Sequence, residues 1–115
     1  MVYEHEKCLN CYDHFEQLRP DIKEVIISKH FLKDAPDFDT KLIVDCQHEH
    51  FTRLHKFEET IEGNHIFRAI RRKIHYVYAI DKNKRLIFLR AFENFKYYKK
   101  FLNKKKMILK IIDLS

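Results

Sequence analysis

The sequence predicts an α+β fold, in which a small antiparallel sheet packs with helices on one of its faces. Residues 64–98 contain three runs rich in Ile, Val, Tyr and Phe, a composition typical of β-strands. Short polar links separate the runs, which favours an antiparallel meander. Before and after this stretch, apolar residues recur at helical spacing. One compact sheet with flanking helices is therefore the expected architecture, within a single domain spanning residues 1–115.

The meander strands are expected at His65–Arg72, Ile74–Ile80 and Arg85–Ala91. The link Asp81–Lys84 is short and polar, and Asn83 tolerates a positive φ. The last two strands should therefore form a hairpin.

The link between the first two strands is basic. Arg71, Arg72 and Lys73 place three cations at one bend, with no acidic residue beside them in the sequence. Their mutual repulsion is relieved by an anion or by solvent. We favour the interpretation that the bend faces an anion, with a solvated turn as the alternative.

Charge is distributed unevenly along the chain. Residues 1–62 carry 8 Lys+Arg against 14 Asp+Glu, a net −6, whereas residues 63–115 carry 15 against 3, a net +12. This separation predicts a basic face for a polyanion such as nucleic acid. A solvated basic surface without a ligand is the alternative, and a membrane surface is less favoured because the basic part is rich in strands.

Compartment and redox state follow from composition. No apolar run approaches the roughly 20 residues of a membrane helix, and the N-terminus lacks the apolar centre of a secretory signal. We therefore expect a cytoplasmic protein that does not contact a membrane. The 3 cysteines leave an odd thiol under any pairing, so reduced thiols are expected.

Three elements are predicted ahead of the long central segment. Residues 7–18 place apolar side chains at helical spacing, and Pro20 ends this helix. Lys23–Ile27 is a brief apolar strand. Ser28 is expected to cap a short helix that runs through Ala35.

A longer helix is predicted from Thr40 to about Glu62, because one helical face would carry apolar residues. Asp37 or Asp39 would cap its start. Gly63 and Asn64 would end it, because they tolerate the left-handed conformation. The face that turns inward would consist of Ile43, Cys46, His50, Leu54, Phe57 and Ile61.

After the meander, Phe95–Lys105 carries aromatic residues at helical spacing among lysines, which predicts a basic amphipathic helix. The tail Met107–Leu114 is apolar and fits an edge strand, a helix extension or a partner surface.

A structural zinc site is a second interpretation of the cysteines. Cys8, Cys11, Cys46 and His50, or His48 in its place, supply enough thiolates and imidazoles for tetrahedral zinc. The same residues would also pack as ordinary core where two predicted helices meet, and we favour buried free cysteines without a cofactor.

The order of elements and several motifs resemble the RelE/ParE superfamily of toxin–antitoxin toxins. EVIISKHFLKD (24–34) is similar to the opening of that family. HIFRAIRRKIHYVYAIDKNKRLIFLRAFENFKYYKKF (65–101) is similar to its core without a gap. The resemblance covers about residues 23–102 and leaves an N-terminal extension, 1–22, and a C-terminal tail, 103–115.

This resemblance implies a ribosome-dependent endoribonuclease that cuts mRNA without a metal, by directing a ribose 2′-OH onto the adjacent phosphate. It also implies a cognate antitoxin as partner, beside the ribosome and mRNA. The basic cluster that contacts RNA falls on Arg68, Arg71, Arg72 and Lys73.

The catalytic positions of the family fall on His75, Arg90 and Tyr98, and Glu93 is a further candidate base. Glu93 and Asn94 stand where a His-Arg pair is common in the family. The intrinsic pKa of His75, near 6.5, suits proton transfer at neutral pH.

Each catalytic candidate also has a structural interpretation. His75 fits a half-buried polar position, Arg90 fits an ion pair with Glu93, and Tyr98 fits the core because it shares a helical stripe with Phe95. Two other functions fit the same fold: a ParE-like gyrase inhibitor that cuts nothing, and a non-catalytic nucleic-acid-binding module.

Overall fold

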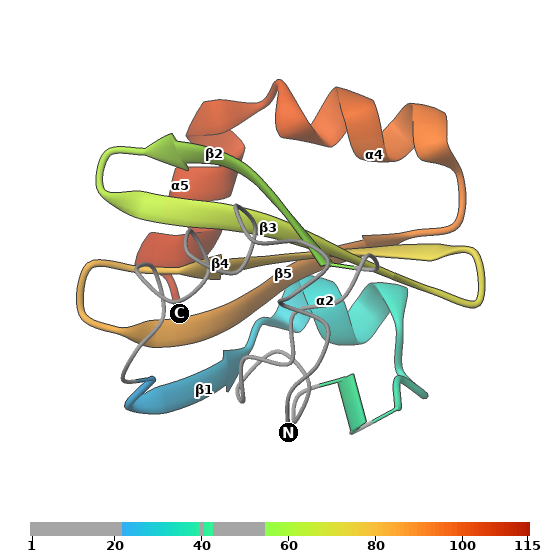
Figure 1. Cartoon of the computed structure of the whole chain (residues 1–115), viewed down its shortest axis with the longest axis horizontal. Helices are drawn as coiled ribbons and strands as arrows, with labels where there is room; N and C mark the ends of the chain where they lie inside the picture. The colour runs from blue at the N-terminus through green and yellow to red at the C-terminus, as the bar shows by residue number, and fades with distance from the viewer. Residues whose placement is uncertain (1–21, 40, 43–54) are drawn as a thin grey trace, which may run out of the picture.

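The computed structural model describes residues 22–39, 41–42 and 55–115. Over these residues the chain is α+β, with a mixed sheet whose strand order is β1-β5-β4-β3-β2 (Figure 1). The elements, in chain order, are β1 (Glu24–Ile27), α2 (Lys29–Asp34), β2 (His55–Ile61), β3 (Asn64–Arg71), β4 (Ile74–Ile80), β5 (Arg85–Phe92), α4 (Phe95–Leu102) and α5 (Lys105–Asp113).

The predicted meander is confirmed, because β3, β4 and β5 pair antiparallel in sequence order. The early strand also joins the sheet as predicted, but it runs parallel to β5, with Glu24 beside Arg85 and Ile27 beside Phe88. The expectation of a purely antiparallel sheet is therefore wrong. A parallel neighbour requires a long connection, and the chain between β1 and β5 includes a helix and three other strands.

The predicted helix over 40–62 is wrong from His55 onward, where β2 pairs antiparallel with β3. Phe57 and Ile61 are four residues apart, a spacing that fits one face of a helix. In β2 the bulge after Phe57 places them on opposite faces of the sheet, Phe57 on the side of α2 and Ile61 on the side of α4 and α5. Residues 40 and 43–54 lie outside the described residues. At the start of the segment, Asp39 accepts a hydrogen bond from the Lys41 amide at 2.9 Å, as predicted for a cap.

Positive φ angles mark the tight turns. Glu62 and Gly63, with φ 48° and 86°, form the β2–β3 turn in place of the predicted helix stop. Between β4 and β5 the left-handed residue is Lys84, φ 63°, and not Asn83 as expected. The Asp81 carboxylate explains this difference, because it accepts the Asn83 amide at 2.9 Å and fixes that part of the turn.

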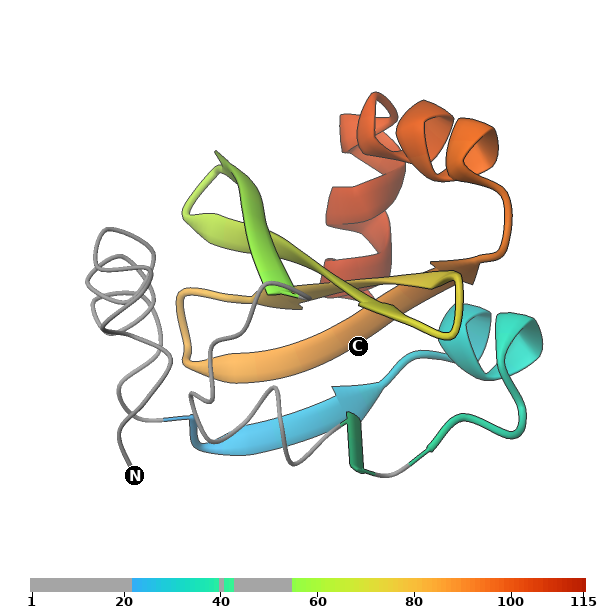
Figure 2. The same ribbon diagram turned by 45° about the vertical axis from the view of Figure 1, so that its right-hand side comes forward.

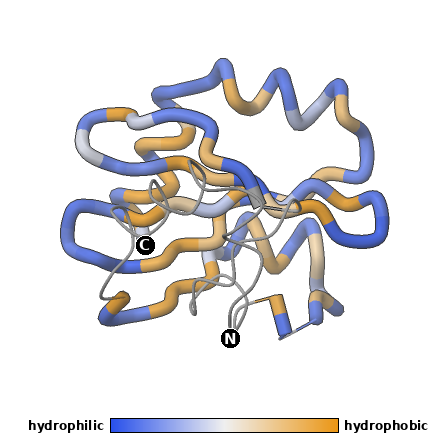
Figure 3. Tube along the Cα trace, in the orientation of Figure 1, coloured by the Kyte–Doolittle hydropathy of each residue, from blue (hydrophilic) through white to orange (hydrophobic). Residues whose placement is uncertain are grey.

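Helices cover both faces of the sheet, which corrects the expectation of helices on one face (Figure 2). α4 and α5 bury one face, and α2 buries the other through Phe31, which is fully buried. Figure 3 shows hydrophobic residues concentrated in the strands and hydrophilic residues at the hairpin turns. The core is therefore two apolar layers, one on each side of the sheet.

The other predicted helices are α2, α4 and a helix over residues 7–18. Ser28 caps α2 as predicted, since its hydroxyl accepts the Phe31 amide at 3.1 Å. The basic amphipathic helix is confirmed as α4, with Asn94 as its cap, and the undecided tail forms helix α5. The helix predicted over 7–18 lies outside the described residues. Among the described residues no helix is long and apolar enough to cross a membrane.

Candidate active site

The predicted site residues lie in three places, two of them on either side of helix α4. His75 and Arg68 lie on one side of the helix, next to Tyr98. Arg90 and Glu93 line a cleft on its other side. The turn residues Arg71 and Arg72 lie on the opposite face of the sheet. The sequence-predicted site is thus three separate groups.

The first group is a buried polar cluster centred on Tyr98, which is only 1% exposed. The Tyr98 hydroxyl donates a hydrogen bond to Glu58 on β2, and Arg68 lies 3.9 Å from the same carboxylate. Burial, followed by the bond to Glu58, raises the pKa of Tyr98 well above its usual range. A tyrosine held in this way stays neutral and cannot stack on a nucleic-acid base.

Sequence reasoning missed Glu58 because that segment was predicted to be a helix. The pairing of β2 with β3 shifts register between Phe57 and Glu59. Such a bulge changes the direction of a side chain relative to a regular strand. Glu58 thereby reaches α4.

His75 is half-buried, as its structural interpretation predicted, and lies against the same cluster. Its ring stacks on Tyr98 with centroids 4.9 Å apart, and Phe95 lies 5.5 Å away. Its Nδ1 is buried and has no hydrogen-bond partner in the described structure. Burial, together with the nearby Arg68 cation, lowers the pKa of His75. The imidazole is therefore neutral at pH 7 and packs as an aromatic ring.

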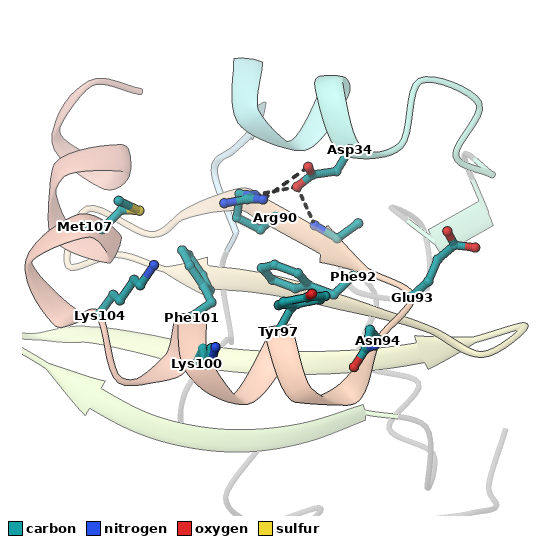
Figure 4. A pocket seen from close by; sticks show the side chains of 11 residues that line it. Asp34, Arg90, Phe92, Glu93, Asn94, Tyr97, Lys100, Phe101, Lys104 and Met107 are labelled. Carbon is teal, nitrogen blue, oxygen red and sulfur yellow. Dashed lines mark hydrogen bonds and ion pairs between the residues drawn. The ribbon is translucent and has the colours of Figure 1, made fainter.

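The second group lines a cleft of about 470 Å³ between α4 and the end of β5 (Figure 4). Aromatic rings occupy its centre, cations lie at one end, and Glu93 lies at the other end with its carboxylate turned outward. The lining residues are Asp34, Arg90, Ala91, Phe92, Glu93, Asn94, Tyr97, Lys100, Phe101, Lys104 and Met107.

Arg90 is positioned by a second bulge. The β4–β5 pairing passes from Tyr78–Phe88 to Val77–Arg90, so Leu89 is the extra residue. The Arg90 guanidinium carbon lies 4.8 Å from the centre of the Phe92 ring. Its carboxylate partner is Asp34 on α2, with Nε and Oδ2 2.5 Å apart, and not Glu93 as the structural interpretation of the sequence had it.

The rest of the cleft offers aromatic surface and positive charge. Tyr97 is 57% exposed at the rim, and the Lys100 ammonium lies 5.9 Å from the centre of its ring. Lys104 lies in the link between α4 and α5 and is exposed. A phosphate can bind the cations, a base can stack on an exposed ring, and Glu93 supplies a carboxylate that can take a proton.

The sequence contained some signal for these residues. Lys100 and Lys104 belong to the basic face of the predicted amphipathic helix. Tyr97 is adjacent to Tyr98, and only the packing of α4 decides which of the two is exposed. Asp34 carried no signal as a partner of Arg90, because 56 residues separate them.

The third group is the basic β3–β4 turn. Arg71 lies 3.7 Å from the carboxylate of Asp39, so the expectation that the bend has no acidic partner is wrong for this residue. Arg72 and Lys73 are exposed. Their role in RNA binding stays a prediction.

The possible zinc ligands Cys8, Cys11, Cys46 and His50, with His48, lie outside the described residues. Within residues 22–39, 41–42 and 55–115, no three His, Cys, Asp or Glu side chains gather as a metal site would require.

No family model, curated protein or solved structure matches this chain. A function must therefore be inferred from the residues of the cleft and the fold that positions them.

Proposed function

We propose that the protein is a RelE-type toxin, a ribosome-dependent endoribonuclease that cuts mRNA by metal-independent attack of a 2′-OH. The observation that carries this proposal is the cleft beside α4. It combines a fixed arginine, two lysines, an exposed aromatic ring and a carboxylate. RNA cleavage by transesterification needs these four kinds of group.

A nucleotide fits the order of groups along the cleft. Its base stacks on Tyr97, its phosphate binds Arg90 and Lys104, and its ribose lies towards Glu93. Glu93 is exposed, so its side chain can rotate to the 2′-OH when RNA binds. Apo geometry of this kind commonly tightens in the substrate complex.

The reaction begins when Glu93 takes the 2′-OH proton. The O2′ attacks the adjacent phosphorus, the bond from phosphorus to the 5′-oxygen breaks, and a 2′,3′-cyclic phosphate forms. Arg90 stabilises the charge that develops on the phosphate oxygens. Lys100 or Lys104 donates a proton to the departing 5′-oxygen, which completes the proton balance.

The buried cluster takes no part in these steps. Tyr98 and His75 hold α4 on the sheet, and through α4 they position the cleft. A toxin of this kind works in the cytoplasm with the ribosome and mRNA, and a cognate antitoxin neutralises it.

The packing of His75 against Tyr98, whose hydroxyl is bonded to Glu58, favours one alternative, a ParE-like gyrase inhibitor. Such a toxin needs no proton transfer, so two of the four predicted catalytic residues can be purely structural. A non-catalytic nucleic-acid-binding module would use the cleft only to hold a strand.

Primer extension on a message translated in a cell-free system tests the proposal. We expect cuts at codons occupied by the ribosome in the presence of the protein. Glu93→Gln removes the base without changing side-chain size, and we expect it to reduce cleavage by about 10² to 10⁴. Glu24→Gln, an exposed carboxylate on β1, should cut like the wild type.

Two outcomes contradict the nuclease. An intact message together with inhibited DNA supercoiling by gyrase would support the ParE-like function. An intact message with unaffected supercoiling would leave the binding module.

A further inference from the structure

Helix α2 contacts β5 at both of its ends, just beyond the point where β1 stops. β1 ends at Ile27, which pairs with Phe88. The Ser28 hydroxyl then donates to the Leu89 carbonyl at 3.2 Å. The Asp34 carboxylate accepts the Ala91 amide at 3.0 Å. The two ends of α2 thus satisfy backbone groups that a longer β1 would otherwise pair.

Asp34 makes further contacts beyond that backbone bond. Its Oδ2 accepts from Nε of Arg90 at 2.5 Å, and its Oδ1 accepts from Nη2 at 3.3 Å. Paired bonds between a carboxylate and a guanidinium fix the plane of the arginine. The rings of Phe92 and Phe101 lie 4.8 Å and 5.6 Å from its central carbon. Arg90 is therefore held on several sides.

One nitrogen of Arg90 remains available for a ligand. In the part of the chain that the structure describes, Nη1 makes no hydrogen bond, whereas Nε and Nη2 both bind Asp34. Figure 4 shows the guanidinium with one side towards Asp34 and the other towards the end of the cleft that Lys104 lines. The donors turned away from Asp34 face the space where a phosphate would lie.

We infer that Asp34 is a positioning residue, which fixes Arg90 so that its Nη1 binds a phosphate of single-stranded nucleic acid in the cleft. The choice of ligand rests on the proposed function. An arginine without this partner would sample several rotamers, and each phosphate contact would then carry the cost of ordering that side chain. Preorganisation by Asp34 removes that cost.

The direction in which Asp34→Ala changes nucleic-acid affinity distinguishes a positioning role from a purely electrostatic one. Asp34→Ala removes a negative charge from the cleft. If charge alone mattered, a polyanion would bind the variant more tightly. Positioning predicts the reverse, a dissociation constant about tenfold larger. This loss of affinity is about what one charge-assisted hydrogen bond contributes. Asp37→Ala is the matched control, because Asp37 is exposed nearby and is not among the described residues that contact Arg90. This variant should bind equally or slightly more tightly than the wild type.

The experiment measures fluorescence anisotropy of a labelled oligodeoxythymidylate, which lacks the 2′-OH and cannot be cut by this chemistry. Circular dichroism first verifies that each variant is folded. Arg90→Ala should weaken binding, and adding Asp34→Ala to it should cause no further loss, because Asp34 acts through Arg90; only the slight tightening expected from the lost negative charge should remain.

Tighter or unchanged binding by Asp34→Ala would overturn the inference, as would equal and additive losses in the double variant. Binding that is insensitive to Arg90→Ala would overturn it too. The nuclease proposal can fail independently. If the wild type binds the oligonucleotide through Arg90 and Asp34 but cuts no message, the positioning role stands and the proposed reaction is wrong.

Discussion

Tyr98 illustrates how one hydroxyl joins three parts of the fold. It sits on α4 and donates to Glu58 on β2, whose side chain is only 12% exposed, with Arg68 of β3 nearby. A buried carboxylate that loses a donor retains its full desolvation penalty. The contact therefore stabilises the position of α4 over the sheet.

Tyr98→Phe should lower the free energy of unfolding by about 1–3 kcal/mol, because Glu58 is left without its hydroxyl donor. Urea denaturation followed by circular dichroism measures the change. Tyr97→Phe is the matched control, since that exposed hydroxyl should contribute within about 0.5 kcal/mol. Equal stability of the two variants would mean that the bond to Glu58 contributes nothing.

His75 makes stability depend on pH. Its folded pKa is lowered, first by burial and then by Arg68, so the unfolded chain binds a proton more readily than the folded chain. Stability is then complete above about pH 6.5 and falls as pH decreases from there towards the lowered folded pKa. Protonation in the fold would place a second cation beside Arg68.

His75→Gln should remove this part of the pH dependence. We expect the difference in urea midpoint between pH 7.5 and pH 5.5, both about one unit from the unfolded pKa, to be smaller in the variant than in the wild type. His30→Gln changes an exposed histidine on α2 and should keep the wild-type difference. An identical pH dependence for all three proteins would contradict the lowered pKa.

At the scale of elements, the β3–β4 turn is strained. Arg72 and Lys73 both adopt the left-handed region, with φ 50° and 68°. A side chain in that region costs on the order of 1 kcal/mol, whereas Asn and Gly tolerate it. Two cations therefore occupy positions that backbone preference alone would not give them.

Replacing the pair by Arg72→Asn with Lys73→Gly should raise the stability of the protein by about 1 kcal/mol. Thermal unfolding measures this gain. Asn83→Gly is the control, because Asn83 does not have a positive φ and the added backbone freedom should destabilise. A loss of stability in the double variant would show that the arginine and lysine side chains stabilise the turn.

The elements also show which sequence signals were sufficient. The meander was predictable because its apolar runs are separated by short polar links, and Ser28 was predictable as a cap because it precedes a helical pattern. The segment containing Phe57 and Ile61 was not, since their spacing fits a helix and gives no sign of the bulge that puts them on opposite faces of a strand. Tertiary pairing with β3 decides between the two.

The candidate site was harder to predict for the same reason. Arg90, Glu93 and Tyr98 were identified from the sequence. The sequence did not indicate that Asp34 is the partner of Arg90 or that Glu58 is the partner of Tyr98. Glu58 and Arg90 both follow from bulges, and a bulge depends on how two strands register. Residues brought together by such pairing leave no local pattern in the chain.

For the whole molecule, the charge asymmetry of the sequence has a structural counterpart. The C-terminal helices lie on one face of the sheet (Figure 2). The lysines of these helices and of the link between them are exposed, and Lys100 and Lys104 line the cleft. Only Lys105 among them has an ion-pair partner in the described residues, Glu59 at 3.1 Å. The exposed lysines are Lys96, Lys99, Lys100, Lys104, Lys105, Lys106 and Lys110.

Affinity for a single strand should therefore fall steeply with salt. If Arg90, Lys100 and Lys104 each contact a phosphate, raising NaCl fourfold should weaken oligonucleotide binding about twentyfold, because counterions are released in proportion to the contacts. Anisotropy titrations at several salt concentrations give the slope. A slope near zero would exclude phosphate contacts as the basis of binding.

The most direct test of the whole account asks which side of α4 carries out the chemistry. Primer extension compares Glu93→Gln, in the cleft, with His75→Gln, beside Tyr98 on the other side of α4, on the same translated message. We predict that Glu93→Gln reduces cleavage at ribosome-occupied codons by about 10² to 10⁴ and that His75→Gln, once verified to be folded, retains it. Cleavage that survives in Glu93→Gln and disappears in folded His75→Gln would contradict the account and place the active site beneath the helix.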